Sequence, residues 1–239
     1  MWKKTVTIDK SYGKECRALL RELGKNKSLV CAVEESKTRI LISVAARDAD
    51  GENAQEYLCD KITKLLTTYF KHLYITESIG IDKFTPAQVC LLAVMVYYDS
   101  EAEYAELFDK ISGYDVICID GVYNFAMKNL KEEWDELCVV SENLFNGDYE
   151  DEDLYDVAGY VVQEKSDRTR LLIADAENPV VTDVSKGGFV SVDDFYGDTT
   201  LDLINCAVGR GAKEVTLDAS FKDKRLLSAL SRFAKVRNI

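Results

Sequence analysis

Residues 116–145, VICIDGVYNFAMKNLKEEWDELCVVSENLF, carry the strongest helical pattern in the chain. A short apolar run comes first. Asp120 then stands where a helix would begin, so that its carboxylate would cap the N–H groups of the first turn. The apolar residues that follow at three- and four-residue steps share one side of a helix: Val122, Ala126, Leu130, Trp134, Leu137 and Leu144. Burying each large one contributes roughly 1.5–3 kcal/mol. We predict that the other segments pack around this helix.

The residues before this stretch predict an N-terminal α/β lobe over residues 1–82. Apolar runs bounded by turn residues indicate strands, and amphipathic runs with start and stop signals indicate helices. The predicted elements are a strand at 5–8, a helix at 11–23 closed by Gly24, a β-hairpin of 28–33 and 39–45, and a long helix from Asp50-Gly51 to about Tyr74.

Residues 83–165 predict an acidic, helical middle. Thr85-Pro86-Ala87-Gln88 combines an N-cap, a proline at the first helical position and a capping-box glutamine. Ser100-Glu101-Ala102-Glu103 predicts a second capping box, at the start of a helix that ends near Gly113. The helix from Asp120 comes next, and another is expected from about Asp151 to Gln163.

Residues 166–239 predict a C-terminal α/β lobe. Strands are expected at 168–174, 180–184, 189–192 and 214–217, with a helix at 199–208 closed by Gly209. Ser220-Phe221-Lys222-Asp223 predicts a capping box at the start of a final helix that ends near Phe233. The fold class is therefore α+β, with mixed α/β portions at both ends of a helical middle. These ends form either two lobes or the halves of one sheet.

The charge is unevenly distributed along the chain. Residues 1–27 carry +5, residues 222–237 carry +5 and residues 28–221 carry −22, which together give the chain its net charge of −12. The acidic middle would repel phosphates, so nucleic acid is an improbable partner there. The basic terminal helices, with Lys10 to Lys25 and Lys222 to Arg237, remain open either as solvated faces or as weak docking sites for an acidic partner, nucleic acid or anionic lipid.

The seven cysteines and the absence of apolar tracts predict the compartment. The cysteines lie among apolar residues, form no CxxC pair and are odd in number, which is typical of buried thiols in a reducing compartment. No segment has the ~18 apolar residues of a spanning helix, and the N-terminus lacks the pattern of a signal peptide. We expect a cytoplasmic protein without a transmembrane segment.

Residue chemistry offers weak candidates for a reactive site. His72, the single histidine, lies beside apolar residues and has no second histidine for a metal set. The run Asp148-Tyr149-Glu150-Asp151-Glu152-Asp153 lacks the EF-hand spacing and its glycine, so a solvated loop at a helix N-terminus explains it better. Gly209-Arg210-Gly211 lies between a helix and a strand, the reverse of a phosphate-binding loop. We predict no catalytic residue, metal or cofactor from these patterns.

One stretch resembles a known family. The residues IDGVYNFAMKNLKEEWDEL resemble the signature region of the YtxC-like proteins of endospore-forming bacteria, most specifically at Asp120, Gly121, Asn124 and Phe125. The helix and strand expected over 199–217 look like the end of that family's sequences, although Ala126 and Val122 depart from its pattern. The resemblance implies a sporulation setting and no defined reaction.

On this basis we expect a non-enzymatic bacterial protein that acts through contacts with a protein partner, and one alternative stays open. The alternative is an enzyme, or a small-ligand or metal-binding protein, that uses a carboxylate-lined pocket. A deep pocket with several acids of raised pKa would favour this alternative, and shallow surfaces with an apolar patch would favour the expected function.

Overall fold

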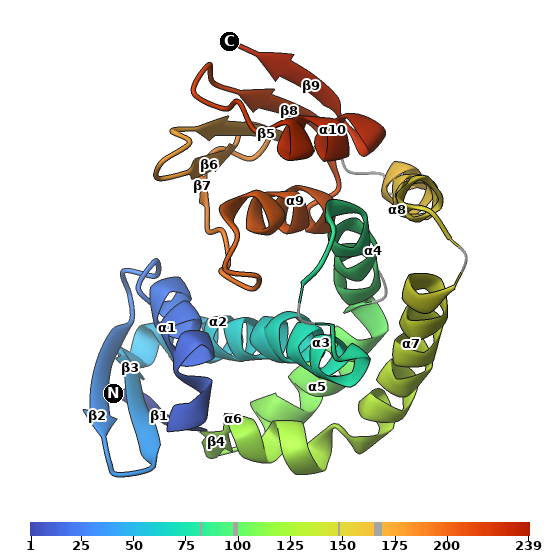
Figure 1. The fold of residues 1–239 in the computed structure, drawn as a ribbon. Helices are drawn as coiled ribbons and strands as arrows, with labels where there is room; N and C mark the ends of the chain where they lie inside the picture. Colours follow the sequence, from blue (N-terminus) through green and yellow to red (C-terminus); the bar gives the residue numbers. More distant parts are fainter. Residues whose placement is uncertain (82, 98–99, 148, 165–168) are drawn as a thin grey trace. The chain divides into compact units, whose positions relative to one another are not determined.

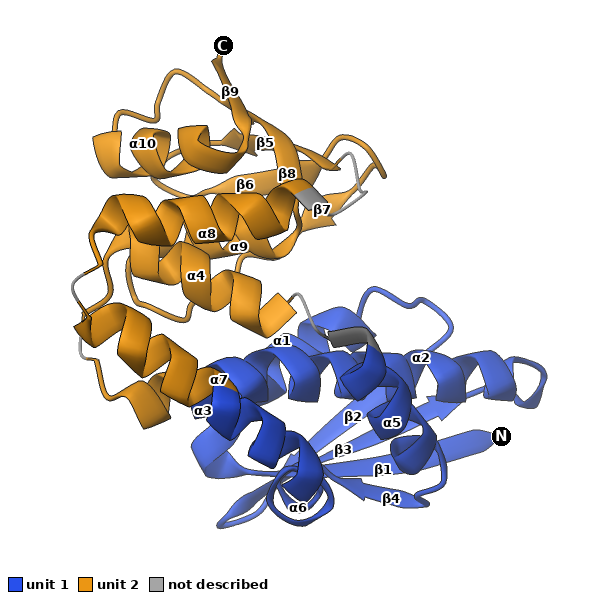
Figure 2. Cartoon of the chain, turned by 90° about the vertical axis from the view of Figure 1, so that its right-hand side faces the viewer, with its two compact units in different colours: residues 1–75, 99–136 blue, residues 76–98, 137–239 orange. Residues whose placement is uncertain are grey.

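The computed structural model describes the whole chain except residues 82, 98–99, 148 and 165–168 (Figure 1). The α+β fold class is confirmed, because the chain folds into helices and two separate mixed sheets. It divides into two compact units, which are coloured separately in Figure 2: residues 1–75 with 99–136, and residues 76–98 with 137–239. The helical middle predicted over 83–165 is thus shared between the units.

Unit 1 contains a four-stranded sheet in the order β2-β3-β1-β4. Its strands are β1 (Trp2–Asp9), β2 (Val30–Glu35), β3 (Arg39–Ala46) and β4 (Val116–Cys118). The predicted hairpin is present as β2 and β3, whereas β4 comes from the middle of the chain and lies parallel to β1. Apolar residues alternate along β1 and β3, so Val6, Ile8, Ile42 and Val44 are buried on one face.

Two helices, α1 (Gly13–Leu23) and α2 (Gly51–Leu65), cover that face of the sheet (Figure 1). The other helices of unit 1 are α3 (Lys71–Ile79, which ends in unit 2), α5 (Ser100–Ser112), which packs against α2, and the short α6 (Ile119–Gly121), which follows β4. The 3₁₀ turns Lys10–Tyr12 and Asp48–Asp50 precede α1 and α2, and the π-helical segment Leu66–Phe70 joins α2 to α3. The long helix predicted from Asp50-Gly51 is therefore present with a π-helical insertion.

Unit 2 contains a five-stranded sheet in the order β7-β6-β5-β8-β9. Its strands are β5 (Thr169–Ala174), β6 (Val180–Asp183), β7 (Phe189–Val190), β8 (Ala212–Leu217) and β9 (Lys235–Asn238). β5, β8 and β9 are parallel, and β6 and β7 form antiparallel hairpins beside them. The sequence reading missed β9, because only Val236 among its residues is apolar.

The helices of unit 2 are α4 (Pro86–Tyr97), α8 (Asp151–Glu164), α9 (Thr199–Gly209), α10 (Lys224–Phe233) and the C-terminal part of α7 (Lys128–Asn146). They share a core with Leu171, Ile173, Val215 and Leu217 of the sheet. α4 packs against α8 and α9, and α10 packs against both of these helices.

The capping signals were correct in one place and wrong in another. At α4, Gln88 N–H donates to Thr85 Oγ1 (3.3 Å) and Thr85 N–H donates to Gln88 Oε1 (2.9 Å), which is the predicted reciprocal box. The box predicted from Ser220 is wrong, since Asp223 caps α10 by accepting from Arg225 N–H (2.8 Å). The side chains of Ser100 and Glu101, in the other predicted box, lie outside what the structure describes.

Gly209 does not close its helix as predicted. It is the last residue of α9, Arg210 is the C-cap, and Gly211 takes the positive φ of 59°. A Cβ on Gly209 would lie 2.5 Å from the Tyr97 ring. The glycine therefore allows α9 to approach α4 closely.

The helix predicted from Asp120 is interrupted, and Asp120 is not its N-cap. Cys118 holds the N-cap position of α6, Asp120 lies inside α6, and the π-helical segment Val122–Ala126 follows. Met127 then leaves helical geometry at φ −102° and ψ 21° before α7 begins. The predicted buried side is confirmed at Val122, Leu130 and Trp134, which are 5%, 2% and 0% exposed. The other predicted members are half-buried: Ala126, Leu137 and Leu144.

Candidate functional site

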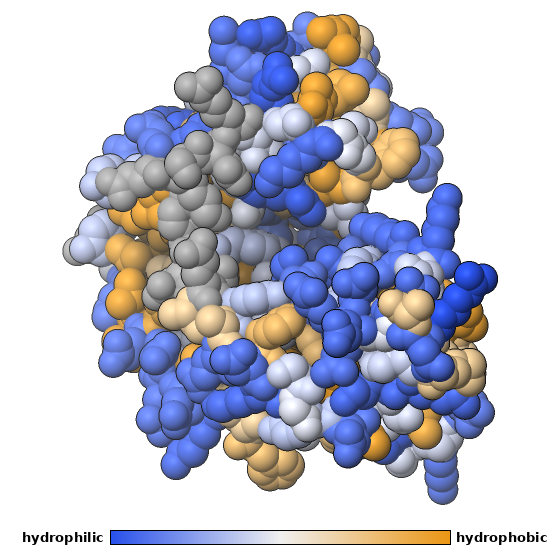
Figure 3. Space-filling view, turned by 180° about the vertical axis from the view of Figure 1, so that it is seen from behind, coloured by the Kyte–Doolittle hydropathy of each residue, from blue (hydrophilic) through white to orange (hydrophobic). Residues whose placement is uncertain are grey.

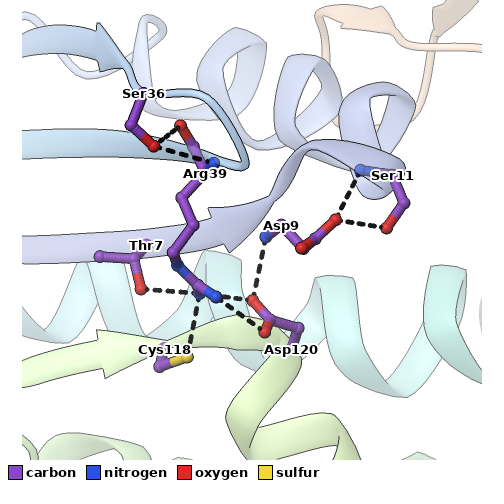
Figure 4. A network of polar contacts seen from close by, with 7 residues as sticks. All are labelled: Thr7, Asp9, Ser11, Ser36, Arg39, Cys118 and Asp120. Atoms are coloured by element: carbon purple, nitrogen blue, oxygen red, sulfur yellow. Dashed lines mark hydrogen bonds and ion pairs between the residues drawn. The ribbon is translucent and has the colours of Figure 1, made fainter.

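The residues of the family resemblance follow the carboxyl end of β4, which is also the carboxyl end of its parallel neighbour β1. Arg39, the first residue of β3, lies at this same end of the sheet because it pairs with Asp9 of β1. Three strands thus converge on one group of polar side chains. We call Thr7, Asp9, Arg39, Cys118 and Asp120 the Arg39 cluster (Figure 4).

Arg39 and Asp120 form a bidentate ion pair at the centre of the cluster. Arg39 Nη2 donates to Asp120 Oδ1 (2.7 Å) and Nη1 donates to Oδ2 (3.2 Å). Arg39 Nη2 also lies 3.0 Å from Thr7 Oγ1 and 3.1 Å from Cys118 Sγ. The hydrogen bonds that Arg39 donates to Asp120 are the main cause of the raised pKa of Arg39. The guanidinium therefore ties β3 to β1 and to the segment after β4.

The backbone completes the cluster. Asp9 N–H donates to Asp120 Oδ1 (3.0 Å), and the Asp9 carboxylate turns away to accept from Ser11 N–H (2.8 Å). These hydrogen bonds from Ser11 lower the pKa of Asp9. Because both oxygens of Asp120 accept from protein donors, the carboxylate acts as a structural acceptor. The sequence had suggested that this carboxylate caps a helix, and this prediction is wrong.

Gly121 lets the chain turn close to the cluster. A Cβ at this position would lie 2.9 Å from Cys118 Sγ, which is closer than ordinary packing allows. The glycine in the Asp120-Gly121 pair is therefore explained by contact with the preceding strand.

Asn124 and Phe125 lie on the π-helical segment Val122–Ala126, which we call the Phe125 turn. Both side chains are exposed, and 85% of Phe125 is open to solvent. Tyr123, between Val122 and Asn124, points inward and is 6% exposed. The residues of the resemblance thus lie in two different environments. Asp120 and Gly121 lie against the strands of the sheet, whereas Asn124 and Phe125 face outward.

Aromatic packing fixes the base of the Phe125 turn. The Tyr123 ring centroid lies 4.7 Å from that of Phe70 and 6.4 Å from that of Tyr12. Lys131 Nζ lies 3.6 Å from the Tyr123 centroid, within the range of a cation–π contact. Phe70 belongs to the other π-helical segment, Leu66–Phe70, so the two π-helical segments of unit 1 meet through these rings.

A buried ion pair that the sequence reading missed lies elsewhere in unit 1. Lys71 Nζ lies 2.7 Å from Glu103 Oε1, and the two side chains are 0% and 5% exposed. Trp134 Nε1 donates to the same oxygen at 3.0 Å. The apolar patterns of the helices that carry Lys71 and Glu103 do not indicate a charged contact. The sequence feature that could have predicted it is a charged residue on the face of a helix that is expected to be buried.

The other predicted candidates occupy structural positions. His72 is 4% exposed, and burial lowers its pKa to about 3. Of the acidic run, Asp151, Glu152 and Asp153 form the first turn of α8, and Asp148 lies outside the described residues. In the described part of the chain, no group of three or more His, Cys, Asp or Glu side chains is placed to hold a metal ion.

One described carboxylate has a pKa raised toward neutrality. Burial raises the pKa of Asp202 to about 6, while N–H groups of Phe195 (2.9 Å) and Tyr196 (3.1 Å) donate to it. These donors belong to the loop before α9, so the carboxylate organises that loop. The nearby charges of Asp194 and Asp198 raise this pKa further, but Asp202 is the one carboxylate of the described residues with a raised pKa, whereas a carboxylate-lined site requires several.

Several cations of the C-terminal basic segment are paired within unit 2. Arg225 lies 3.0 Å from Asp198 and 2.9 Å from Asp223, and Arg232 lies 2.6 Å from Glu152. This pairing reduces the field that a polyanion would meet there. The surface in Figure 3 is mostly hydrophilic, with apolar residues in small scattered groups.

No helix among the described residues is both long enough and apolar enough to cross a bilayer. No protein-family model, curated protein or solved structure matches this chain.

Proposed function

We propose that this protein acts without catalysis, by inserting Phe125 into a pocket on a protein partner. The supporting observation is the 85% exposure of Phe125 on a turn whose neighbouring residues are fixed. Asp120 is tied to Arg39 before the turn, and Tyr123 and Met127 are buried within and after it. The backbone that carries Phe125 therefore loses little freedom on binding, which favours affinity.

The partner is proposed to be present during sporulation in a bacterial cytoplasm. The support is the resemblance of Asp120, Gly121, Asn124 and Phe125 to the YtxC-like signature, together with the outward position of Asn124 and Phe125. Aromatic residues are enriched at the centres of protein interfaces, where a few anchors supply most of the binding energy. Phe125 is the anchor, and Asn124 supplies an adjacent polar contact.

The test is an affinity pull-down with three forms of the full chain: wild type, Phe125→Ala and Phe189→Ala. Phe189, on β7, is a matched control because it is 80% exposed and far from the signature in sequence. Wild type and Phe189→Ala should retain a partner from sporulating cells that is missing from vegetative cells. Phe125→Ala should lose it, since loss of an anchor costs about 2 kcal/mol or roughly 30-fold in affinity.

A stability measurement separates loss of binding from loss of fold. The Phe125 side chain is largely exposed, so Phe125→Ala should leave the urea midpoint of unfolding unchanged. The proposal is wrong if Phe125→Ala retains the partner like wild type, or if both cell types yield the same proteins.

A further inference from the structure

The sheet of unit 2 has one face that no described helix covers. β5, β8 and β9 are parallel neighbours, and right-handed crossovers place the connecting helices α9 and α10 on the same face. α4 and α8 pack against these two helices. Residues of the covered face are buried in the core: Leu171, Ile173, Val181, Val215 and Leu217. Side chains alternate along a strand, so the residues between them lie on the opposite face, which we call the open face.

One row of side chains crosses the open face through all five strands. Laterally paired residues form this row, in the order Phe189, Thr182, Leu172, Thr216 and Arg237. It spans four strand spacings, or about 19 Å. Phe189 is 80% exposed, and the three residues between it and Arg237 are half-buried. The row is therefore a strip of apolar and hydroxyl groups, with an exposed aromatic ring at one edge and a guanidinium at the other.

The open face is basic although the chain is acidic. A second row, beside the first, contains Arg170, Glu214 and Lys235. Arg170 and Lys235 are exposed, and neither forms an ion pair within the described residues. Arg237 lies 3.4 Å from Glu214, which is the one carboxylate among the described strand residues of this face. Three cations and one carboxylate give the open face a charge of +2, whereas the chain carries −12.

The combination of an exposed ring and unpaired cations indicates what this face binds. Unpaired bases stack on aromatic side chains, and nearby cations hold the phosphates that link them. An acidic peptide would use the cations and leave the ring of Phe189 without a role. The bases of a duplex are already stacked on one another, so a duplex offers the ring no free base.

We propose that the open face binds single-stranded nucleic acid, with a base stacked on Phe189 and phosphates held by Arg170 and Lys235. The hydroxyl groups of Thr182 and Thr216 lie between these positions, where they can donate to phosphate or sugar oxygens. The paired cations Arg225 and Arg232 do not reduce this binding, because they belong to α10 on the covered face.

Fluorescence anisotropy of a labelled strand of eight uridines tests the proposal on the full chain. Two phosphate contacts give a slope of about −1.4 in log affinity against log salt, so affinity should fall roughly sevenfold between 50 and 200 mM salt. Phe189→Ala should weaken binding roughly tenfold through lost stacking, and Phe189→Trp should bind at least as tightly as wild type. A duplex of the same length should bind more weakly than the single strand.

Two double variants separate this face from general charge effects. Arg170→Gln with Lys235→Gln should weaken binding and flatten its salt dependence. The matched control is Lys222→Gln with Lys224→Gln, which removes the same charge from exposed positions at the start of α10 and should bind like wild type. All four cations are exposed, so the fold should be unaffected.

The proposal is overturned if the single strand does not bind at 50 mM salt, if Phe189→Ala binds like wild type, or if the two double variants lose affinity equally. Tighter binding of an oligoglutamate of the same length would also overturn it, because the face would then belong to an acidic peptide. Phe125→Ala should bind the oligonucleotide like wild type, whereas Phe189→Ala should keep the protein partner. Each of the two proposals can therefore fail without the other.

Discussion

At the scale of single residues, Arg39 and Asp120 form an ion pair although they lie 81 positions apart in the sequence. This distant contact determines what Asp120 does in the folded chain. A carboxylate before a helical pattern is typical of an N-cap, and nothing nearby in sequence predicts an arginine partner. In the folded chain the guanidinium satisfies both carboxylate oxygens, so Asp120 fixes the start of α6 by an ion pair with β3.

Arg39→Met should destabilise the protein, because it leaves the half-buried Asp120 carboxylate without its cation. Hydrogen bonds to charged groups contribute about 1.5–3 kcal/mol, so we expect a loss of about 2 kcal/mol in the free energy of unfolding, measured by urea denaturation. The control is Arg237→Met, since the exposed Arg237–Glu214 pair (3.4 Å) should contribute less than about 0.5 kcal/mol. Equal losses for the two variants would contradict a structural role for the Arg39 cluster.

At the scale of elements, Lys71, Glu103 and Trp134 join α3, α5 and α7 through one buried oxygen. The apolar periodicity placed Trp134 inside, and it could not show which polar group its indole N–H would meet. Buried polar groups require partners, so the packing of these three helices depends on this specific contact as well as on apolar area.

Lys71→Met should cost about 3–5 kcal/mol, because it leaves a buried carboxylate without its cation. Lys71→Met combined with Glu103→Gln should cost less than the single change, since the amide oxygen still accepts from Trp134 and no charge stays buried. Chemical denaturation followed by Trp fluorescence measures both. A double variant less stable than Lys71→Met would show that the charges themselves stabilise the three helices.

At the scale of the whole molecule, Asp202 makes stability depend on pH. Burial raises its pKa from 3.8 to about 6, so the folded protein binds this proton more tightly than the unfolded chain. The stabilising contribution is complete below about pH 4 and is lost as the pH rises through 6. Each pKa unit corresponds to about 1.4 kcal/mol, which gives a loss on the order of 2–3 kcal/mol.

Asp202→Asn should remove this dependence, because the amide stays neutral and keeps an acceptor for Phe195 and Tyr196. The variant should match wild type near pH 4 and be more stable at pH 7 in urea titrations. Buried His72, whose pKa is lowered to about 3, weakens both proteins as the pH falls below about 6.5, so the difference between them isolates Asp202. Parallel pH curves would contradict the assignment.

The sequence by itself determined the features that rest on local physics. The apolar periodicity correctly predicted that Leu130 and Trp134 are buried. Turn residues predicted the β2–β3 hairpin, and the capping box of Thr85 and Gln88 predicted the start of α4. The sequence also directed attention to the segment that contains Asp120 and Phe125. Such features follow from backbone hydrogen bonding and side-chain spacing over a few residues, which any copy of the segment would share.

Only the tertiary structure decided that the two ends build separate sheets, that β4 from the middle joins the first of them, and that Asp120 binds Arg39. It alone decided that Tyr123 points inward while Phe125 points out. The physical reason is that each of these outcomes depends on groups distant in sequence. The three residues of β4 and the carboxylate of Asp120 could each adopt several local arrangements. The partner that the fold brings next to them determines which arrangement is adopted.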